Sequence, residues 1–315
     1  MRPLRLGTRG SKLALRQAEL VRDALRVHHP GLVVELVTIT TRGDRLADVP
    51  LQQISGQGVF ARALEDALLA GTIDCAVHSL KDLPGVARPG LVLAAFPPRE
   101  DARDALVAQT APSFAALPHG ARVATSSPRR AAQLLAARPD LEIVPIRGNV
   151  DTRLRKLAEQ QLDATVLAVA GLQRLGLAEW ITEALPLGLC LPAVGQGALA
   201  VQGRAGDTTT QALVAPLDDA PTRAAVEAER GLLAALGGGC RVPIAGHATV
   251  EGTTLRLQGL LAAPDGRTVL RDQVTGPTEA AAALGRELAE RLLAAGGAAL
   301  VAAAATSSLD PTLEE

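Results

Sequence analysis

Residues 74–85 read DCAVHSLKDLPG, and this stretch decides the fold. Its first half has the two-residue period of a β-strand, with Cys75 and Val77 on the apolar face. Its second half turns polar at Lys81 and Asp82, and a Pro-Gly pair ends the element. Open α/β sheets bind ligands at the carboxyl ends of their strands. The stretch therefore predicts an α/β fold with a polar site where this strand ends.

Lys81 is unusual for this chain. Lysine and arginine together number 32, but only three of them are lysines: Lys12, Lys81 and Lys156. A Lys-Asp pair after a strand is most often a surface ion pair, and such pairs contribute little individually. The motifs described below favour a functional interpretation instead.

The composition is that of an ordinary globular chain. A length of 315 residues predicts two or three domains, and a hydrophobic content of 48% is enough for sizeable cores. Aromatic residues make up 1%, which argues against a module that stacks nucleic-acid bases. The net charge of -1 argues against a broad polyanion-binding surface. Nucleic acid is therefore not an expected partner, and an anion site requires a local concentration of arginine.

The sequence favours a cytoplasmic protein without a membrane segment. Its N-terminal residues have no apolar core long enough for a signal peptide, and no stretch reaches the ~20 apolar residues of a membrane span. Cys75, Cys190 and Cys240 are expected to be reduced thiols. Cys75 and His78 have a ligand-like spacing, but no second pair completes a zinc site, so no metal is expected.

The chain is expected to form two α/β domains and a small α+β domain. A strand, a helix and a second strand open the chain as a βαβ unit, and a similar pattern recurs after residue 120. Breaks near residues 97–101 and 191–198 are interpreted as two crossings between these domains. The expected division is domain 1 at 1–97 plus 198–215, domain 2 at 98–197 and domain 3 at 216–315.

Two segments lack the period of a helix or a strand. Residues 41–58 are predicted to form a lid or a disordered loop, because long stretches of this kind in compact domains usually do so. Residues 205–221 are predicted to be a polar linker.

One local pattern occurs three times: a buried strand, a turn of Gly, Ser or Thr with Arg, and the start of a helix. It lies at residues 8–11, 125–130 and 147–153. Helix N-termini present free N–H groups, and arginine adds bidentate contacts to carboxylate or phosphate. A single Ser or Thr at such a place is usually a plain N-cap. Three instances in two domains predict an interdomain cleft that binds an anion with several carboxylates or phosphates.

Asp82 is the candidate acid of this cleft. A carboxylate that faces many guanidinium groups can stabilise a cation on a substrate or transfer a proton at a leaving amine. Phe60 follows a glycine-containing loop and can line the cleft or belong to a core. Cys240 follows three glycines and precedes Arg241, so it can be a reactive thiolate or a buried structural thiol. The residues alone leave these alternatives open.

Six motifs, in order along nearly the whole chain, resemble the porphobilinogen deaminase (hydroxymethylbilane synthase) family. They are VHSLKDLP at 77–84, TSSPRR at 125–130, IRGNV at 146–150, LAVAGL at 167–172, PAVGQG at 192–197 and GGCRVP at 238–243. The resemblance implies an α/β fold of two periplasmic-binding-protein type II-like domains with a small C-terminal α+β domain. It also suggests a monomer.

The resemblance implies a reaction and a cofactor. Four porphobilinogen molecules are condensed head to tail into hydroxymethylbilane with release of ammonia. The primer is a dipyrromethane cofactor, and Cys240 matches the residue that holds it by a thioether. Asp82 matches the catalytic carboxylate, which stabilises an azafulvenium-like cation, and Phe60 is placed with the substrate. The positions that match those binding the acetate and propionate groups are Arg9, Ser11, Lys81, Ser127, Arg129, Arg130, Arg147, Arg153 and Arg174.

Three positions depart from the family pattern. Gln57 stands where the family usually has Lys, and Gln53 stands where a basic residue is common, so the charge that this loop brings to the substrate is reduced. Pro128 replaces a more usual Leu and suits the first turn of a helix.

Two other classes of protein compete with this interpretation. A solute-binding protein on the same scaffold needs the anion cleft but neither Asp82 nor Cys240, and it usually carries an export signal. An enzyme acting on phosphate esters could use the three helix starts, but the sequence has no Walker pattern or paired metal carboxylates.

Overall fold

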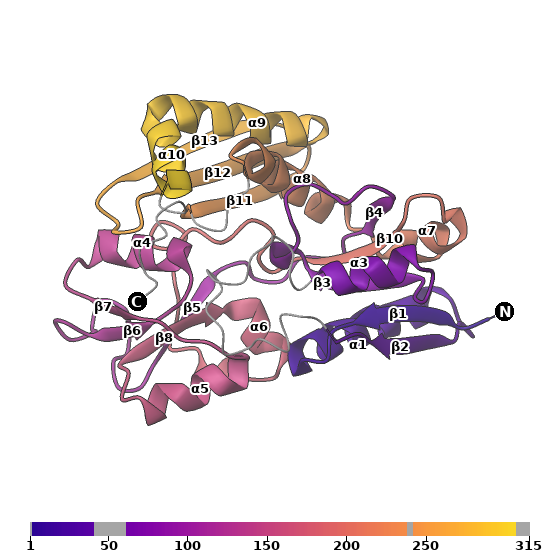
Figure 1. Cartoon of the computed structure of the whole chain (residues 1–315), viewed down its shortest axis with the longest axis horizontal. Helices are drawn as coiled ribbons and strands as arrows, with labels where there is room; N and C mark the ends of the chain where they lie inside the picture. Colours follow the sequence, from indigo (N-terminus) through magenta and orange to yellow (C-terminus); the bar gives the residue numbers. More distant parts are fainter. Residues whose placement is uncertain (1, 41–60, 238–241, 307–315) are drawn as a thin grey trace.

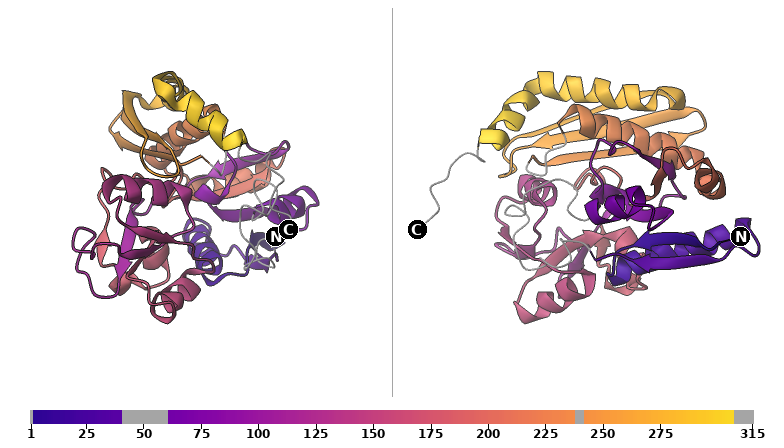
Figure 2. Two further views of the ribbon diagram at one scale, coloured as in Figure 1. Left: turned by 60° about the vertical axis from the view of Figure 1, so that its left-hand side comes forward. Right: turned by 45° about the vertical axis from the view of Figure 1, so that its right-hand side comes forward.

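The computed structural model describes residues 2–40, 61–237 and 242–306. Three sheets, each covered by its own helices, divide the described chain into three parts, and Figure 1 shows the third part lying over the other two. Figure 2 shows the same arrangement from two further sides. The predictions for Gln53, Gln57, Phe60 and Cys240 concern positions outside the described residues.

Domain 1 contains a five-stranded sheet in the order β2-β1-β3-β10-β4. β1 pairs in parallel with β2 and β3, whereas β10 is antiparallel and lies between β3 and β4. Side chains alternate along β3, so Val77 packs with helix α1 and Ala76 packs with helix α3 on the opposite face. The elements are β1 (Leu4–Thr8), α1 (Lys12–His28), β2 (Val34–Thr38), α3 (Arg62–Leu69), β3 (Cys75–Ser79), β4 (Leu91–Ala95), β10 (Leu199–Arg204) and α7 (Thr208–Val214).

Domain 2 repeats this design with the sheet order β7-β6-β8-β5-β9. β6 is parallel to β7 and β8, and β5 is the antiparallel strand between β8 and β9. Leu106 of β5 packs with α4 on one face, while Ala105 and Val107 pack with α5 on the other. The elements are β5 (Asp104–Ala108), β6 (Arg122–Ala124), α4 (Pro128–Ala137), β7 (Glu142–Val144), α5 (Val150–Glu159), β8 (Ala164–Ala168), α6 (Val169–Arg174) and β9 (Glu183–Ala184).

Domain 3 is a three-stranded antiparallel sheet, β11-β12-β13, with helices packed against it. Helices α8 and α9 cross closely, because a Cβ at Gly231 would lie 2.7 Å from the carbonyl oxygen of Ala282 and one at Gly285 would lie 2.2 Å from that of Ala228. The elements are α8 (Ala220–Ala235), β11 (Ile244–Glu251), β12 (Thr254–Ala262), β13 (Val269–Pro277), α9 (Ala281–Leu292) and α10 (Ala298–Thr306).

Two crossings join domains 1 and 2, from β4 to β5 and from β9 to β10. They touch at Gly197, whose φ is +86° and whose Cβ, if it had one, would lie 2.4 Å from the carbonyl oxygen of Glu100. Only glycine fits this backbone geometry and this spacing. The chain therefore passes twice between two sheets of equivalent strand order.

Several details differ from the predictions. Strands β5 and β9, which complete the second sheet, were not predicted. The predicted polar linker at residues 205–221 instead contains α7, whose start is capped by Asp207 accepting from the backbone N–H of Thr210 at 3.0 Å. Polar residues here therefore begin a helix rather than extend a loop. In the part of the chain that the structure describes, no helix has the length and apolarity needed to cross a membrane.

Candidate active site

Asp82 reaches the interdomain cleft because β3 ends in a short 3-10 turn, Leu80–Asp82. The backbone N–H of Leu80 donates to the carbonyl of Ala198 at 3.0 Å, which ties this turn to the second crossing. The Asp82 side chain is 40% exposed, and its Oδ2 lies 4.0 Å from Nη1 of Arg9. β3 is thus followed by a carboxylate that is accessible to a ligand and lies beside a cation.

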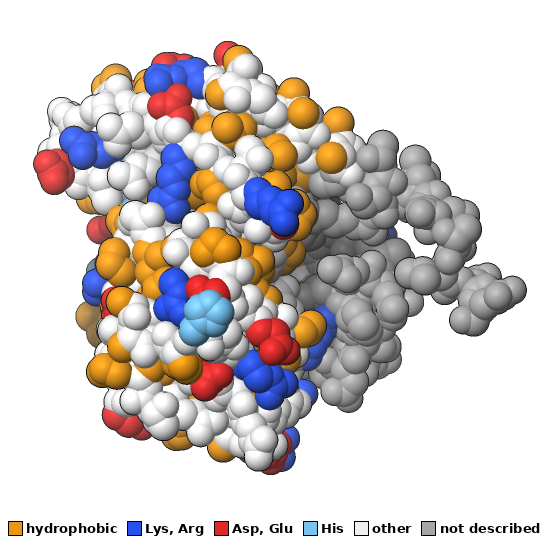
Figure 3. Space-filling view, turned by 90° about the vertical axis from the view of Figure 1, so that its left-hand side faces the viewer, with side chains coloured by type: hydrophobic (Ala, Val, Ile, Leu, Met, Phe, Trp, Pro, Cys, Tyr) orange, Lys and Arg blue, Asp and Glu red, His pale blue; other side chains and the backbone are white. Residues whose placement is uncertain are grey.

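Among the described residues, seven cationic side chains and two carboxylates line the cleft, which has a volume of about 690 Å³. The cations are Arg9, Lys12, Lys81, Arg130, Arg147, Arg153 and Arg174, and the carboxylates are Asp82 and Asp151. By contrast, the face of the molecule in Figure 3 carries cationic and anionic side chains interspersed among uncharged ones. The cleft therefore concentrates positive charge in a chain whose net charge is only -1, as an anion site in such a chain requires.

Two of the three predicted helix starts are capped by serine. Ser11 accepts from the backbone N–H of Ala14 at 3.3 Å and also lines the cleft. Ser127 accepts from the backbone N–H of Arg130 at 3.4 Å, but it is not among the lining residues. Ser126 lines the cleft instead, and its hydroxyl donates to the carbonyl of Ile146 at 2.8 Å. The sequence pattern located the helix start but did not show which serine faces the ligand.

Two arginines of the cleft have buried N–H groups without a partner among the described residues: Nη1 of Arg147 and Nε of Arg174. Arg174 also donates through Nη2 to the carbonyl of Gly197 at 2.7 Å. Burial, together with the charges of Arg130 and Arg147, lowers the pKa of Arg153 to about 10. Unsatisfied buried donors are rare in proteins, and a carboxylate would satisfy these and offset the crowded positive charge. The residues therefore fit a ligand rich in carboxylates.

Lys81 lines the cleft between the domains and is exposed there. Its Nζ donates to Oε1 of Gln196 at 3.2 Å. Desolvation by the surrounding protein, followed by the charge of Arg130, lowers the pKa of Lys81 to about 8, although Asp82 opposes this shift. The lowered pKa makes the charge of Lys81 sensitive to pH above neutrality.

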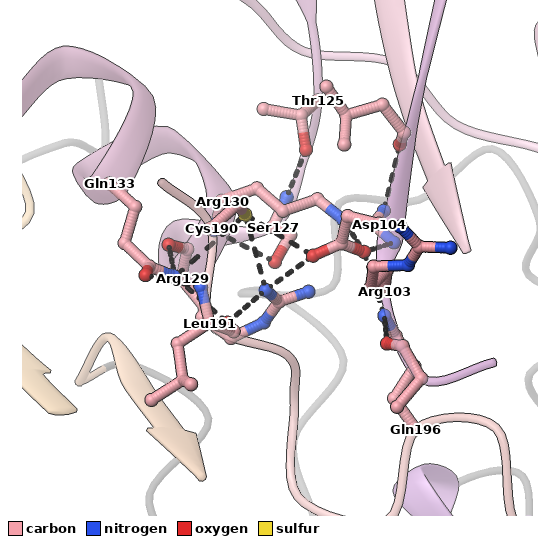
Figure 4. A network of polar contacts seen from close by, with 12 residues as sticks. Arg103, Asp104, Thr125, Ser127, Arg129, Arg130, Gln133, Cys190, Leu191 and Gln196 are labelled. Atoms are coloured by element: carbon pink, nitrogen blue, oxygen red, sulfur yellow. Dashed lines mark hydrogen bonds and ion pairs between the residues drawn. The ribbon is translucent and has the colours of Figure 1, made fainter. Parts of the chain in front are cut away.

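Asp104 holds two neighbouring arginines in the interior of domain 2, and Figure 4 shows the side chains that converge on it. Nη1 of Arg129 donates to Oδ2 at 2.6 Å, and Nη2 of Arg130 donates to Oδ1 at 2.6 Å. These charges hold the pKa of the fully buried Asp104 well below its usual range. Arg130 lines the cleft, whereas Arg129 does not and donates instead to the carbonyl of Leu191 at 2.7 Å. The structure thus separates two arginines that the sequence treated alike.

An ion pair that the sequence did not suggest spans the cleft. Nζ of Lys12 at the start of α1 lies 2.6 Å from Oδ2 of Asp151 in the first turn of α5. The two residues belong to different domains, so the contact joins the domains away from their crossings. No sequence signal pairs these residues, because their proximity depends on how the domains are placed.

The described cysteines are structural. Burial raises the pKa of the thiols of Cys75 and Cys190, the latter to about 12, so neither is a reactive thiolate. Among residues 2–40, 61–237 and 242–306, no cluster of three or more His, Cys, Asp or Glu side chains could hold a metal ion.

The fold places a cleft rich in arginine and lysine between two α/β domains, and a smaller α+β domain packs beside them. A family model described as "Porphobilinogen deaminase, dipyromethane cofactor binding domain" matches residues 4–212, and one described as "Porphobilinogen deaminase, C-terminal domain" matches residues 223–294. The chain belongs to the porphobilinogen deaminase family, and its cofactor is dipyrromethane.

Relatives are similar over nearly their whole length. The porphobilinogen deaminase of Syntrophotalea carbinolica is 55% identical over 95% of this chain and 95% of its own. That of Roseiflexus castenholzii is 56% identical over 95% of this chain and 98% of its own. Among solved structures, the periplasmic sulfonate-binding protein SsuA of Methylobacillus flagellatus KT is 16% identical over 73% of this chain and 67% of its own, with a TM-score of 0.39. That last likeness is too distant to carry an argument.

Proposed function

We propose that the cleft is the site at which four porphobilinogen molecules are condensed head to tail into hydroxymethylbilane with release of ammonia. The family supports this reaction. The observation in the structure that carries the proposal is Asp82, an accessible carboxylate at the carboxyl end of β3 in a cleft lined by seven cations. Each pyrrole brings an acetate and a propionate group, which this excess of cations can bind.

Asp82 is proposed to act on the aminomethyl group of the substrate. The amine leaves as ammonia only if it carries an extra proton. The Asp82 carboxyl group can hydrogen-bond to that proton on the amine or transfer a proton to it. The same negative charge can stabilise the positive charge left on the substrate carbon when ammonia departs. Arg9, whose Nη1 lies 4.0 Å from Oδ2, places a positive charge beside this carboxylate.

Arg130, Arg147 and Lys81 are proposed to bind the carboxylates of the dipyrromethane cofactor, which supplies the primer to which the first substrate is joined. Nη1 of Arg147 is a buried donor without a partner among the described residues, as expected for a group whose acceptor is a ligand. Arg9, Ser11, Arg153 and Arg174 are proposed to bind substrate, and Ser126 is added because it lines the cleft.

Cys240 is proposed to be the cofactor's point of attachment. It follows the end of α8 at Ala235 by five residues, a reach of up to ~18 Å for extended chain. That end of α8 lies beside the loop after Asp82, because a Cβ at Gly85 would contact the backbone of Ala234 at 3.4 Å. Nη2 of Arg230 also donates to the carbonyl of Gly85 at 2.9 Å. These contacts hold the end of α8 close to the loop that follows Asp82, which supports an attachment point shortly after this helix.

The test of the proposed acid is the exchange Asp82→Asn, which keeps the shape and removes the charge. Turnover of porphobilinogen should fall by about 10²–10⁴-fold, the usual contribution of a general acid or base. Asp151→Asn is the matched control, since its side chain is 43% exposed and also lines the cleft. Its effect should be far smaller. Equal losses in the two variants would show that the cleft needs negative charge in general rather than a carboxylate at Asp82.

We also propose that the protein works as a cytoplasmic monomer. The free, buried thiols of Cys75 and Cys190 suit a reducing compartment. Sedimentation at micromolar concentration should give a single species of about the chain mass, 32.4 kDa. A stable dimer at that concentration would contradict this part of the proposal.

A further inference from the structure

We propose that Gln196 is a positioning residue for Lys81. Because contacts from all three domains hold Gln196, the position of the Lys81 ammonium depends on all three. The inference rests on the proposed function of the cleft and adds a residue to it. Gln196 lies in the second crossing between domains 1 and 2 and is 1% exposed. It does not itself line the cleft, so it acts through the lysine.

The neighbours of Gln196 dictate the orientation of its amide. Nε2 donates to the carbonyl of Ala102 at 2.7 Å and to Oδ1 of Asp104 at 2.9 Å. Both partners are acceptors only, so the NH₂ group must face them. Oε1 is thereby turned toward domain 1, where it accepts from Nζ of Lys81 at 3.2 Å. Asp104 thus positions one cation of each domain: Arg130 of domain 2 directly, and Lys81 of domain 1 through Gln196.

The backbone of Gln196 is held from domain 3. Nε of Arg99 donates to the carbonyl of Gln196 at 2.9 Å. The same guanidinium donates to both carboxylate oxygens of Glu229, at 2.6 and 3.2 Å. Glu229 belongs to α8, is fully buried, and accepts from the backbone N–H of Gly195 at 2.7 Å. The helix that precedes Cys240 therefore fixes the segment that presents the Gln196 amide to Lys81.

A neutral acceptor suits a lysine that must bind carboxylates. Among the described residues, Gln196 is the one side chain that accepts a hydrogen bond from Nζ of Lys81. An ammonium has three N–H donors, so the two that do not bond to Gln196 can donate to a ligand. A carboxylate in place of the amide would form an ion pair with the lysine and neutralise its charge. The neutral amide orients the ammonium, whose positive charge remains available to pair with a ligand carboxylate.

The test measures the ionisation of Lys81 directly. The chain has three lysines, so labelling lysine with ¹³C at Cε gives three signals, and loss of one in Lys81→Arg assigns Lys81. In Gln196→Met the ammonium loses an acceptor that favours its charged form, and the titration midpoint of Lys81 should fall by roughly one pH unit. The alkaline limb of the turnover profile should move down by the same amount.

The matched control is Gln202→Met. Gln202 is also 1% exposed, but it lies on β10 and donates to Oε1 of Glu65 at 3.3 Å, outside the cleft. Its loss should leave the Lys81 midpoint unchanged. All variants are compared at equal cofactor occupancy, read from the intact mass. If Gln196→Met fails to fold, Gln196→Asn shortens the reach of the amide and should lower the midpoint in the same direction.

An unchanged Lys81 midpoint in a folded Gln196 variant would overturn the inference, as would an equal shift in Gln202→Met. Because the titration does not require turnover, it can fail while Asp82→Asn still identifies the acid. Conversely, it can succeed if Asp82 proves dispensable. The two proposals are therefore tested separately.

Discussion

β3 of domain 1 and β8 of domain 2 occupy the same place in two sheets of the same order, yet they end differently. After β3 the chain turns at once and presents Lys81 and Asp82 to the cleft. After β8 it continues into α6, which ends at Arg174. Domain 2 also has a carboxylate at this edge, Asp104, but that residue is fully buried beneath Arg129 and Arg130. One domain thus exposes its acid, and the other uses its acid to fix cations.

This contrast shows how one topology can supply two kinds of chemistry. A carboxylate that must act on a substrate needs an open side, and the Asp82 side chain is 40% exposed with Nη1 of Arg9 at 4.0 Å. A carboxylate that must orient guanidinium groups is most effective when dry and fully paired.

Asp104→Asn should have the largest effect on the folded state. It leaves Arg129 and Arg130 as buried cations without their shared counter-charge, and breaking a buried ion pair in this way typically costs about 3–5 kcal/mol. The free energy of unfolding in urea measures the loss. A loss below about 1 kcal/mol would show that Asp104 is not the anchor of domain 2.

Arg147→Met should weaken binding without unfolding the protein. Its Nη1 has no partner among the described residues, so the variant removes a contact made to the ligand, worth roughly tenfold to a hundredfold in affinity for a charged hydrogen bond. Cofactor occupancy by intact mass and the KM for porphobilinogen are the measurements. The control is Arg155→Met. Arg155 is an exposed residue of the nearby helix α5 and pairs with Glu159, so its loss should change neither the cofactor occupancy nor the KM.

The pH dependence of binding should reveal Lys81. Because the pKa of Lys81 is lowered to about 8, its ammonium is charged below that pH and loses its charge as the pH rises through it. The contact of Lys81 with the cofactor carboxylates should therefore weaken, and turnover should fall, above about pH 8. Lys81→Arg should move this limb to higher pH, since guanidinium stays protonated. If the alkaline limb is unchanged in Lys81→Arg, a group other than Lys81 is responsible for it.

Lys12→Ala should have the smallest effect. Its ion pair with Asp151 spans the cleft, but Lys12 is 80% exposed, and exposed pairs contribute at most about 1 kcal/mol. Turnover should change by less than about threefold, measured at low and at high salt. A larger change would mean that this pair holds the domains together at the mouth of the cleft.

The sequence was most informative where a local rule decides the structure. The period of residues 74–85 predicted β3, and the turn after it placed Asp82 at the edge of the sheet that borders the cleft. The helix starts at Ser11 and Ser127 followed from capping chemistry. The repeated βαβ pattern predicted two equivalent domains, and both sheets have the same order.

The rest depended on contacts between distant segments. Strand β5 follows a crossing and lies antiparallel beside β8, so no local signal placed Asp104 next to Arg129 and Arg130. Adjacent arginines in one helix therefore could not be separated into a cleft residue and an interior residue. The link from Gln196 to Lys81 joins residues 115 positions apart, and only the placement of the crossings brings them together.

The intact mass of the purified protein under denaturing conditions shows whether the cofactor is attached at Cys240. We expect a covalent excess equal to two pyrrole units in the native sequence and its absence in Cys240→Ala. An unmodified mass that does not change after incubation with porphobilinogen would contradict the account and leave the cleft as that of a solute-binding protein.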